Sequence, residues 1–472
     1  MGVSTESSIV SDGTQDPPSP FGDPPTMRIL IVGAGAIGFQ LGKRLSQDGY
    51  DITVVEVDAR RVKRVSDQLD VLLIEGSGTS YRVLKQAGVE HADVVAAMTT
   101  CDEVNILACR LAKKAGVAIT MARVRNPEFT DPDFVLSPEE MGVDVVIHPE
   151  KETADAVVRL IRQSSANYAI EFEEGKVQIV GVRLDDHSPL LNAPLEEIGR
   201  RHGQPPIRIA AIKRKQQTII PHGKDILLPG DQVFAVCQPS YTERFIELTG
   251  HKDIRIDNIM ILGGGLIGQF IAAELAGDTR VKIIESSVEK SWEIADNLPD
   301  TLVIQGDGTD LDLLATEGIL DMDAFVAVTG DDENNIIATL LAQHLGVSRT
   351  IALVNRVSYL PITPTIGLDA VVSKQLLTVN AVQRYIRHRQ VASIASLPGV
   401  DAECIEYIAA AGSKITKKPL KDISFPKNAR IGAVTHGQEL IIPTGATHLE
   451  PGDRAVVFVM HHALNDVEKL FG

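Results

Sequence analysis

Most of this chain of 472 residues consists of two copies of one sequence unit. The clearest sign is a set of three glycines that recurs, with the same internal spacing, 230 positions later. A looser match at an offset of 222 positions pairs Pro-Gly-Asp at 229–231 with Pro-Gly-Asp at 451–453. Tandem copies adopt one fold twice, so each element predicted for the first copy has to be matched in the second. The paired glycines are Gly33 with Gly263, Gly35 with Gly265, and Gly38 with Gly268.

The first part of each copy has the pattern of a parallel sheet with helices on both faces. In the first copy, short apolar runs at 28–32, 52–55, 71–74, 94–97 and 119–124 alternate with amphipathic stretches. Strands that are apolar throughout belong to sheets covered on both sides, and their alternation with helices indicates a doubly wound domain. We therefore predict an α/β fold that contains two tandem Rossmann-like doubly wound parallel-sheet lobes.

The second part of each copy has shorter strands and more turn residues. In the first copy, strand-like runs at 177–182, 207–212 and 232–236 are followed by a short helix near 243–248. This pattern predicts a small α+β lobe after each Rossmann-like lobe.

A helix with an apolar stripe joins the two parts, at 151–163 in the first copy and at 373–387 in the second. We expect each stripe to pack on its own lobe, with a crossover onto a partner as the alternative. The predicted boundaries are a disordered tail at 1–26, Rossmann-like nucleotide-binding lobes at 27–150 and 258–372, crossover helices at 151–166 and 373–388, and small C-terminal lobes at 167–250 and 389–472.

Composition narrows the class of partner. With 46 Lys and Arg against 63 Asp and Glu, the formal net charge is −17, which repels phosphate backbones, so we expect no nucleic-acid partner. No apolar run approaches the roughly 18 to 20 residues that span a bilayer. Four cysteines without C-x-x-C spacing favour a reducing compartment, and so a cytoplasmic protein.

The candidate chemistry lies at the glycine turns. In each copy G-x-G-x-x-G follows the first strand and opens a helix, whose free N–H groups can bind a pyrophosphate. An acid near the end of the second strand, Glu56 or Glu285, can accept both ribose hydroxyls, and it favours NAD(H) over a cofactor with a 2′-phosphate. The turn residues assigned to the cofactor are Gly33, Gly35, Ala36, Ile37 and Gly38 in the first copy and Gly263, Gly265, Leu266, Ile267 and Gly268 in the second.

Further loops at the predicted carboxyl edge of each sheet add candidate contacts. Small residues after the third strand would leave room for an adenine. A threonine after the fourth strand has two interpretations, as a ligand contact or as part of a helix cap. These candidates are Gly76, Ser77, Gly78 and Thr99 in the first copy and Gly306, Asp307, Gly308 and Thr329 in the second.

Two arginines distinguish the copies. Arg123 and Arg125 lie two positions apart at the end of the fifth strand, so both point to the same face of the sheet. Their guanidinium groups could bind additional phosphates such as those of ATP or ADP. The second copy has Leu353 and Asn355 at these positions, so the two sites are not equivalent. The alternative is that both arginines form surface salt bridges with nearby acids such as Glu128.

The chain resembles the TrkA family, the regulatory subunits of Trk potassium-uptake systems, which are built from two tandem regulator-of-K+-conductance (RCK, or KTN) units. The resemblance rests on the glycine turns, the two acids, the G-x-G-T segments, Arg123-Val124-Arg125, and the T-x-x-[DE]-x-x-N stretches at 99–105 and 329–335. Ser77 departs from the pattern, because many relatives carry an acid there.

The resemblance implies a peripheral assembly on the cytoplasmic face of the cell's inner membrane. It implies docking beneath a membrane K+-translocating subunit of the TrkH/TrkG kind, and control by NAD(H), ATP and ADP. It also implies a homo-tetramer, in which four chains complete a ring of eight Rossmann-like lobes.

Two alternative functions remain open. An NAD-dependent oxidoreductase needs a proton donor or base beside the nicotinamide. Tyr81 and Lys85 form Y-x-x-x-K, but they lie directly after the third strand and the second copy has Leu311 and Ala315 there, so we predict a non-enzymatic protein. The other alternative is the regulatory subunit of a cation-proton antiporter, which would share every motif above.

Overall fold

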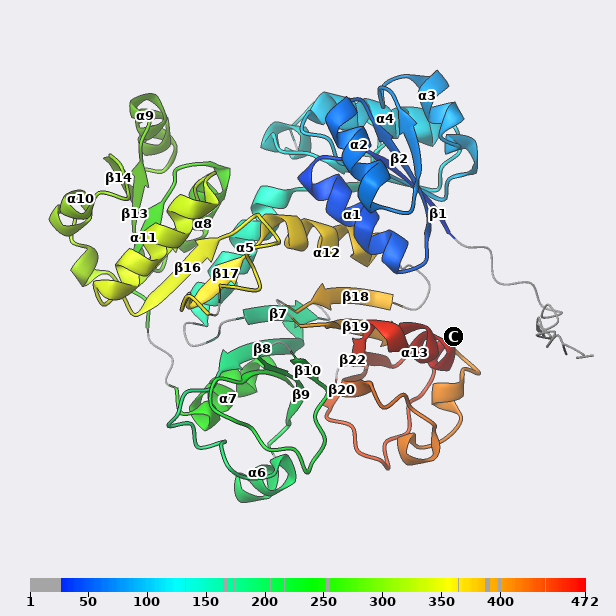
Figure 1. The fold of residues 1–472 in the computed structure, drawn as a ribbon, viewed down its shortest axis with the longest axis vertical. Coiled ribbons are helices and arrows are strands. Elements are labelled where there is room, and N and C mark those ends of the chain that lie inside the picture. Colours follow the sequence, from blue (N-terminus) through cyan, green and yellow to red (C-terminus); the bar gives the residue numbers. More distant parts are fainter. Residues whose placement is uncertain are drawn as a thin grey trace, which may run out of the picture.

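The computed structural model describes residues 27–472 apart from 132, 164, 165, 167, 173, 174, 204, 216, 252–254, 364, 387–390, 398, 399 and 438. The tail predicted at 1–26 lies outside the described residues. Within them the chain forms two six-stranded and two five-stranded sheets. Figure 1 shows the two Rossmann-like lobes side by side in the upper part of the view and the two small lobes below them. The predicted α/β class, with each Rossmann-like lobe followed by a small α+β lobe, is confirmed.

The first Rossmann-like lobe is a parallel sheet with the strand order β3-β2-β1-β4-β5-β6. The strand order reverses between β1 and β4, and such a reversal opens a ligand crevice at the carboxyl ends of the strands. The strands are β1 (Arg28–Val32), β2 (Asp51–Glu56), β3 (Leu72–Glu75), β4 (Val94–Ala97), β5 (Ile119–Arg123) and β6 (Val145–Ile147), and the helices are α1 (Ala36–Gln47), α2 (Ala59–Gln68), α3 (Tyr81–Gln86) and α4 (Asp102–Lys114).

The second Rossmann-like lobe repeats this topology, in the order β14-β13-β12-β15-β16-β17. Its central strands are buried almost throughout, because helices cover both faces of the sheet. The strands are β12 (Asn258–Leu262), β13 (Arg280–Glu285), β14 (Thr301–Gln305), β15 (Ala324–Ala327), β16 (Arg349–Leu353) and β17 (Ala370–Val372), and the helices are α8 (Leu266–Leu275), α9 (Val288–Asn297), α10 (Leu311–Thr316) and α11 (Asp332–His344).

The small lobes are antiparallel sheets, each with a hydrophobic core of its own and a further core that the two lobes share. Phe234 of the first lobe and Phe458 of the second belong to the same buried cluster. The first has the order β10-β9-β11-β8-β7, with β7 (Tyr168–Phe172), β8 (Val177–Arg183), β9 (Ile207–Arg214), β10 (Gln217–Ile219), β11 (Gln232–Cys237), α6 (Leu195–Arg201) and α7 (Thr242–Thr249). The second has the order β18-β19-β22-β20-β21, with β18 (Val391–Ser396), β19 (Ala402–Ile408), β20 (Ala429–His436), β21 (Glu439–Ile441), β22 (Arg454–Met460) and α13 (Leu464–Phe471).

The connecting helices α5 (Pro149–Arg162) and α12 (Lys374–Ile386) exchange lobes. Helix α5 packs on α8, and its Val157 shares a core with Ile261 of the second Rossmann-like lobe. Helix α12 packs on α1, and its Val382 shares a core with Ile31 of the first. Figure 1 shows both helices between the two lobes. The expectation that each stripe packs on its own lobe is therefore wrong. Helical periodicity identifies the buried face of a helix, but not the surface that covers it.

Arg349 secures the far end of α5 to the second lobe. This residue begins β16 and is 2% exposed, and its Nη1 lies 3.0 Å from the Asp369 carboxylate. Its Nη2 donates to the carbonyl of Leu160, at 3.2 Å, and to that of Ala166. The last carbonyls of a helix have no partner within the helix, so this guanidinium satisfies groups that would otherwise be buried without one.

Candidate nucleotide-binding sites

The first and last glycines of each turn are required by backbone geometry. Gly33 and Gly263 have φ angles of +94° and +109°, a region that side chains disfavour. A Cβ atom on Gly38 would lie 1.9 Å from the Gly33 carbonyl oxygen, and one on Gly268 would lie 2.1 Å from that of Gly263. Both turns therefore bring the start of a helix into direct contact with the end of the central strand.

The middle glycines face open space. A Cβ atom on Gly265 would meet nothing within 4 Å, and one on Gly35 would meet only Arg61 Nη1, at 3.9 Å. Each glycine is the N-cap of its helix and makes no side-chain capping bond, so the first N–H groups of α1 and α8 face this space. A pyrophosphate could accept from them.

The apolar members of the turns divide into two groups. Ile37 and Ile267 are buried in the cores of their lobes, so only their main chain is available to a ligand. Ala36 is exposed and Leu266 is partly exposed at the helix starts.

The two acids are held beside the glycine turns. Glu56 is buried, and its carboxylate accepts from the N–H groups of Ala34 at 2.6 Å, Val57 at 2.8 Å and Asp58 at 2.9 Å. In the second copy Glu285 accepts from Gly264 N–H at 3.0 Å. Both carboxylates thus stand at the end of the second strand of their lobe, next to the turn, as a ribose acceptor would.

The same acid of the second copy has two further donors. Glu285 accepts from the N–H of Ser287 at 2.9 Å and from the hydroxyl of Ser286 at 3.2 Å. The main-chain cradle therefore recurs in both copies, with one contact to the glycine turn and at least one to the segment after the strand.

The glycines of the G-x-G-T segments have a packing role. A Cβ atom on Gly78 would lie 2.2 Å from Val32 Cγ1, and one on Gly308 would lie 2.0 Å from Leu262 Cδ1. In the same segments, a Cβ on Gly76 would lie 2.8 Å from Val83 Cγ2 and one on Gly306 would lie 2.4 Å from Leu313 Cδ2. These glycines allow the segment to cross closely over the central strand, whatever room they also leave for an adenine.

Ser77 and Asp307 build equivalent turns. Ser77 Oγ lies 2.8 Å from Thr79 Oγ1, and Asp307 Oδ1 accepts from the hydroxyl of Thr309 at the same distance. Hydrogen bonds from the Thr309 main chain and side chain lower the pKa of Asp307, so this acid is ionised at neutral pH. The departure at Ser77 therefore changes the charge of the loop and not its shape.

Thr99 and Thr329 are fixed by an asparagine that the sequence marked only as part of a motif. Asn105 Oδ1 accepts from the N–H of Thr99 at 2.9 Å and from its hydroxyl at 2.7 Å, and Asn105 Nδ2 donates to the Arg123 carbonyl at 2.8 Å. Asn335 repeats these bonds with Thr329 and with the Leu353 carbonyl. Each asparagine therefore ties together the ends of two neighbouring strands at the ligand edge.

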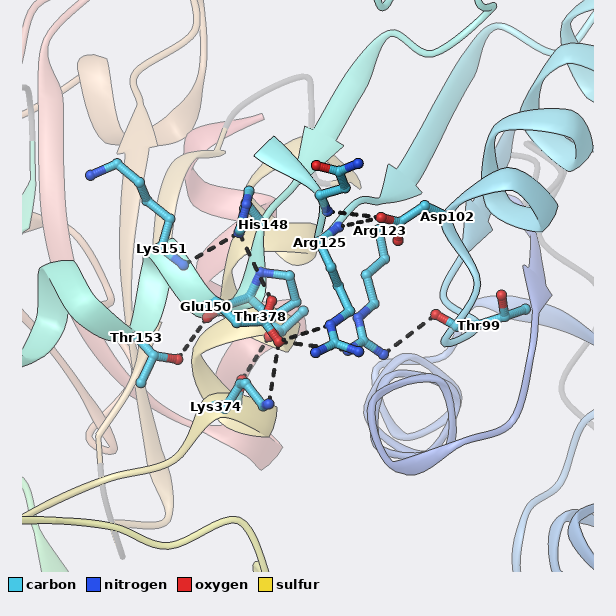
Figure 2. A network of polar contacts seen from close by, with 12 residues as sticks. Thr99, Asp102, Arg123, Arg125, His148, Glu150, Lys151, Thr153, Lys374 and Thr378 are labelled. Carbon is cyan, nitrogen blue, oxygen red and sulfur yellow. Dashed lines mark hydrogen bonds and ion pairs between the residues drawn. The ribbon is translucent and has the colours of Figure 1, made fainter. Parts of the chain in front are cut away.

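Arg123 and Arg125 face Glu150, at the start of α5. Figure 2 shows both guanidinium groups directed toward this carboxylate, together with Lys374 from the start of α12. Arg123 Nη2 lies 3.9 Å from Glu150 Oε1, Arg125 Nε lies 3.5 Å from it, and Lys374 Nζ lies 3.4 Å from it. The acid that both arginines face is thus Glu150, and not Glu128. Burial lowers the pKa of Arg123, while Glu150 opposes this shift.

The second copy has no cation at the two positions that correspond to Arg123 and Arg125, and Arg356, which follows them, pairs with Glu333 at 2.7 Å. Leu353 is buried in the core of its lobe, and Asn355 donates from its main-chain N–H to Asp332 at 2.9 Å. The difference in charge between the two candidate sites is therefore also a difference in the structure.

A cleft of about 510 Å³ lies next to this cluster. It is lined by Thr100, Asp102 and Arg125 of the first Rossmann-like lobe and by Leu266 of the second, so it connects the ligand edge of one copy with the glycine turn of the other. A larger cavity, of about 710 Å³, lies between the small lobes and is lined by Arg208 and Arg430 among others. The residues that line this cavity do not include the glycine turns or the acids Glu56 and Glu285. A glycine turn binds its ligand along an open sheet edge instead.

The Y-x-x-x-K pair does not have the environment of a catalytic dyad. Tyr81 and Lys85 both bind Glu90 Oε1, each at 3.0 Å. This bond raises the pKa of Tyr81, whereas a tyrosine that donates and accepts protons near neutral pH needs a lowered one.

In the part of the chain that the structure describes, no three His, Cys, Asp or Glu side chains are grouped as a metal site requires. Among the same residues, no helix has both the length and the apolar character that a membrane crossing requires.

Comparison with known proteins assigns family models to both copies. The TrkA-N domain model matches residues 29–149 and 259–374, and the TrkA-C domain model matches residues 179–250 and 404–472. Among curated proteins, the Trk system potassium uptake protein TrkA homolog 1 of Methanosarcina mazei is 37% identical, covering 94% of this chain and all of that protein. The Trk system potassium uptake protein TrkA of Azorhizobium caulinodans is 34% identical, covering 94% of this chain and 98% of that protein.

Solved structures agree with the tandem fold. The crystal structure of the GsuK RCK domain aligns with a TM-score of 0.58 at 19% identity, covering 97% of each chain. The GsuK channel bound to NAD aligns with a TM-score of 0.60 at 19% identity, covering 97% of this chain and 81% of that one. Similarity at this level of identity bears on the fold alone.

Proposed function

Because the chain belongs to the TrkA family, with TrkA-N and TrkA-C domains each present twice, we propose that it is the nucleotide-binding regulatory subunit of a potassium-uptake system. The observation that carries this proposal is the repeated combination of a glycine turn with an acid held beside it, Glu56 in one copy and Glu285 in the other. The names of its curated relatives, Trk system potassium uptake proteins, supply the physiological context.

The ligands that fit these sites are adenine nucleotides. NAD(H) suits both copies, because each offers helix N–H groups for a pyrophosphate and a carboxylate for the ribose. ATP and ADP suit the first copy in particular, since Arg123 and Arg125 lie at its ligand edge. The second copy lacks these charges, so we expect it to be the weaker sensor of phosphate number.

A contact path leads from the first site to the small lobes. Helix α1 begins at the first glycine turn, and Arg44 near its other end binds Glu403 and lies 2.6 Å from His461 Nε2, both in the second small lobe. Gln383 of α12 donates to Asp48 at the end of α1, at 3.0 Å. A nucleotide that shifts α1 therefore acts on α12 and on the second small lobe together.

The proposed partner is a membrane K+-translocating subunit of the TrkH/TrkG kind, with this chain bound at the cytoplasmic face of the inner membrane. Co-purification with such a subunit tests the proposal, followed by K+ uptake assays in cells that lack or contain this chain. We expect uptake to depend on the chain. Association with a cation-proton antiporter instead, without an effect on K+ uptake, would replace this partner with the antiporter alternative.

The oxidoreductase alternative predicts sustained turnover. We expect NADH absorbance to stay constant when the protein is incubated with a panel of metabolites, because Tyr81 and Lys85 are engaged with Glu90 and not with a substrate. Continuous oxidation of NADH, proportional to protein concentration, would favour the enzyme.

Self-association is expected as part of this function. Signalling to a pore requires several lobes that move against one another, and four chains would supply eight. The Rossmann-like lobes expose large apolar side chains such as Trp292 and Ile337, which contacts between copies would cover. Sedimentation velocity at micromolar concentration should show a tetramer, with and without NADH. A monomer under both conditions would contradict this prediction.

A further inference from the structure

We propose that Lys374, which belongs to the second copy, completes the first nucleotide site and recognises the terminal phosphate of a nucleoside triphosphate. This inference rests on the proposed function, in that it assumes a nucleotide at the first glycine turn. It adds a residue that the repeat pattern does not predict, because Lys374 follows the second Rossmann-like sheet and lies 251 positions after Arg123.

The cations of the cluster surround a single carboxylate oxygen. Three cations converge on one oxygen, Glu150 Oε1, at 3.4 Å for Lys374, 3.5 Å for Arg125 and 3.9 Å for Arg123. Charge-assisted hydrogen bonds of this kind are normally about 2.7 to 2.9 Å long. Figure 2 shows the three side chains directed toward this carboxylate, and by these distances none of them forms a short bond to it.

Positive charge exceeds negative charge in this cluster. Three positive side chains face one carboxylate, and the nearby Asp102 carboxylate already accepts from the main-chain N–H groups of Arg125 and Asn126, at 3.0 and 2.9 Å. Arg123 is 7% exposed and Glu150 is 3% exposed, and both retain a buried atom without a hydrogen-bond partner, Nε of Arg123 and Oε2 of Glu150. Buried N–H donors of this kind are normally paired, so the Arg123 guanidinium has unused capacity to bind an anion. Glu150 Oε2 is an acceptor and adds no such capacity.

The cluster also has the position of a ligand contact. The cluster lies at the carboxyl edge of the first sheet, where Arg123 Nη1 donates to the Thr99 carbonyl at 3.4 Å and Arg125 lines the cleft of about 510 Å³. Lys374 is placed here by packing, because α12 continues into the core of the first lobe through Val379 and Val382. Its amino group therefore belongs structurally to the first site.

These observations select the ligand chemistry. A terminal phosphate carries up to two negative charges and three acceptor oxygens, enough to bind all three cations. NAD(H) and ADP have no phosphate beyond the pair at the glycine turn, so they do not extend to Lys374. A triphosphate would compete with Glu150 for the cations, and Lys374 would exchange its ion pair with α5 for one with the ligand.

The test is isothermal calorimetry of the full chain with ATP, ADP and NADH. Lys374→Ala is expected to weaken ATP binding by about tenfold to a hundredfold and to change ADP and NADH binding less than about twofold. Lys374→Arg should retain most of the ATP affinity, and Glu150→Gln should increase it, because the competing carboxylate is removed. Arg123→Ala combined with Arg125→Ala should remove the preference for ATP over ADP.

Lys151→Ala is the matched control. It removes a lysine from the start of α5 whose amino group pairs with Asp155 at 3.0 Å, away from the cluster, and it should leave all three affinities unchanged. An unchanged ratio of ATP to ADP affinity in Lys374→Ala would overturn the inference, and so would a loss of ATP affinity in Glu150→Gln. A parent chain that binds none of the three nucleotides would instead contradict the proposed function.

Discussion

Replacing Glu56 and Glu285 together by alanine is expected to abolish high-affinity NADH binding. Each carboxylate can accept from two ribose hydroxyls, and a hydrogen bond to a charged group contributes about 1.5 to 3 kcal/mol. Loss of two such bonds corresponds to a decrease in affinity of about a hundredfold or more at each site. Calorimetry should show two NADH molecules per chain for the parent and one for each single variant.

Glu75→Ala provides the control for this experiment. Glu75 pairs in register with Glu56 on the neighbouring strand and is exposed, so its removal should leave NADH binding unchanged. The parent should also bind NADPH more weakly than NADH. In each site the 2′-phosphate of NADPH would lie close to the carboxylate of that copy and be repelled by it. If the double variant binds NADH as tightly as the parent, the assignment of the two acids to the ribose is wrong.

The second large effect concerns Arg349. We expect Arg349→Met to reduce the free energy of unfolding by about 3 to 5 kcal/mol, since it leaves the buried end of α5 and the Asp369 carboxylate without their common partner. Urea denaturation followed by circular dichroism measures this change. NADH binding to the second copy should weaken more than binding to the first. The reason is that α5 packs on α8, and α8 begins at the second glycine turn.

Arg255→Met is the matched control, because Arg255 is an exposed arginine whose Nε lies 2.7 Å from Asp257. Surface substitutions of this type change stability by about 0.5 kcal/mol or less. A loss of less than about 1 kcal/mol in Arg349→Met would show that the contacts to α5 contribute little, and the exchange of helices would then depend on apolar packing alone.

Sequence patterns over short distances determined the strands, the turns and the repeat of this protein. The duplication, the parallel strands and the glycine turns could be predicted from sequence, because strand periodicity and turn geometry depend on residues a few positions apart. The requirement for glycine at Gly33 and Gly38 is of this kind, since both lie within one turn. The acids Glu56 and Glu285 could be predicted as well, because the spacing from turn to second strand is a property of one βαβ unit.

Contacts between distant segments were decided by the tertiary structure. The sequence marked the stripe on α5 as buried, but only the fold places it on α8, and it equally places Arg349 against the end of that helix. The convergence of Arg123, Glu150 and Lys374 depends on the same exchange. Apolar burial has no directional preference for one lobe over another, so periodicity predicts which residues become buried, while the packing of the complete chain determines what they contact.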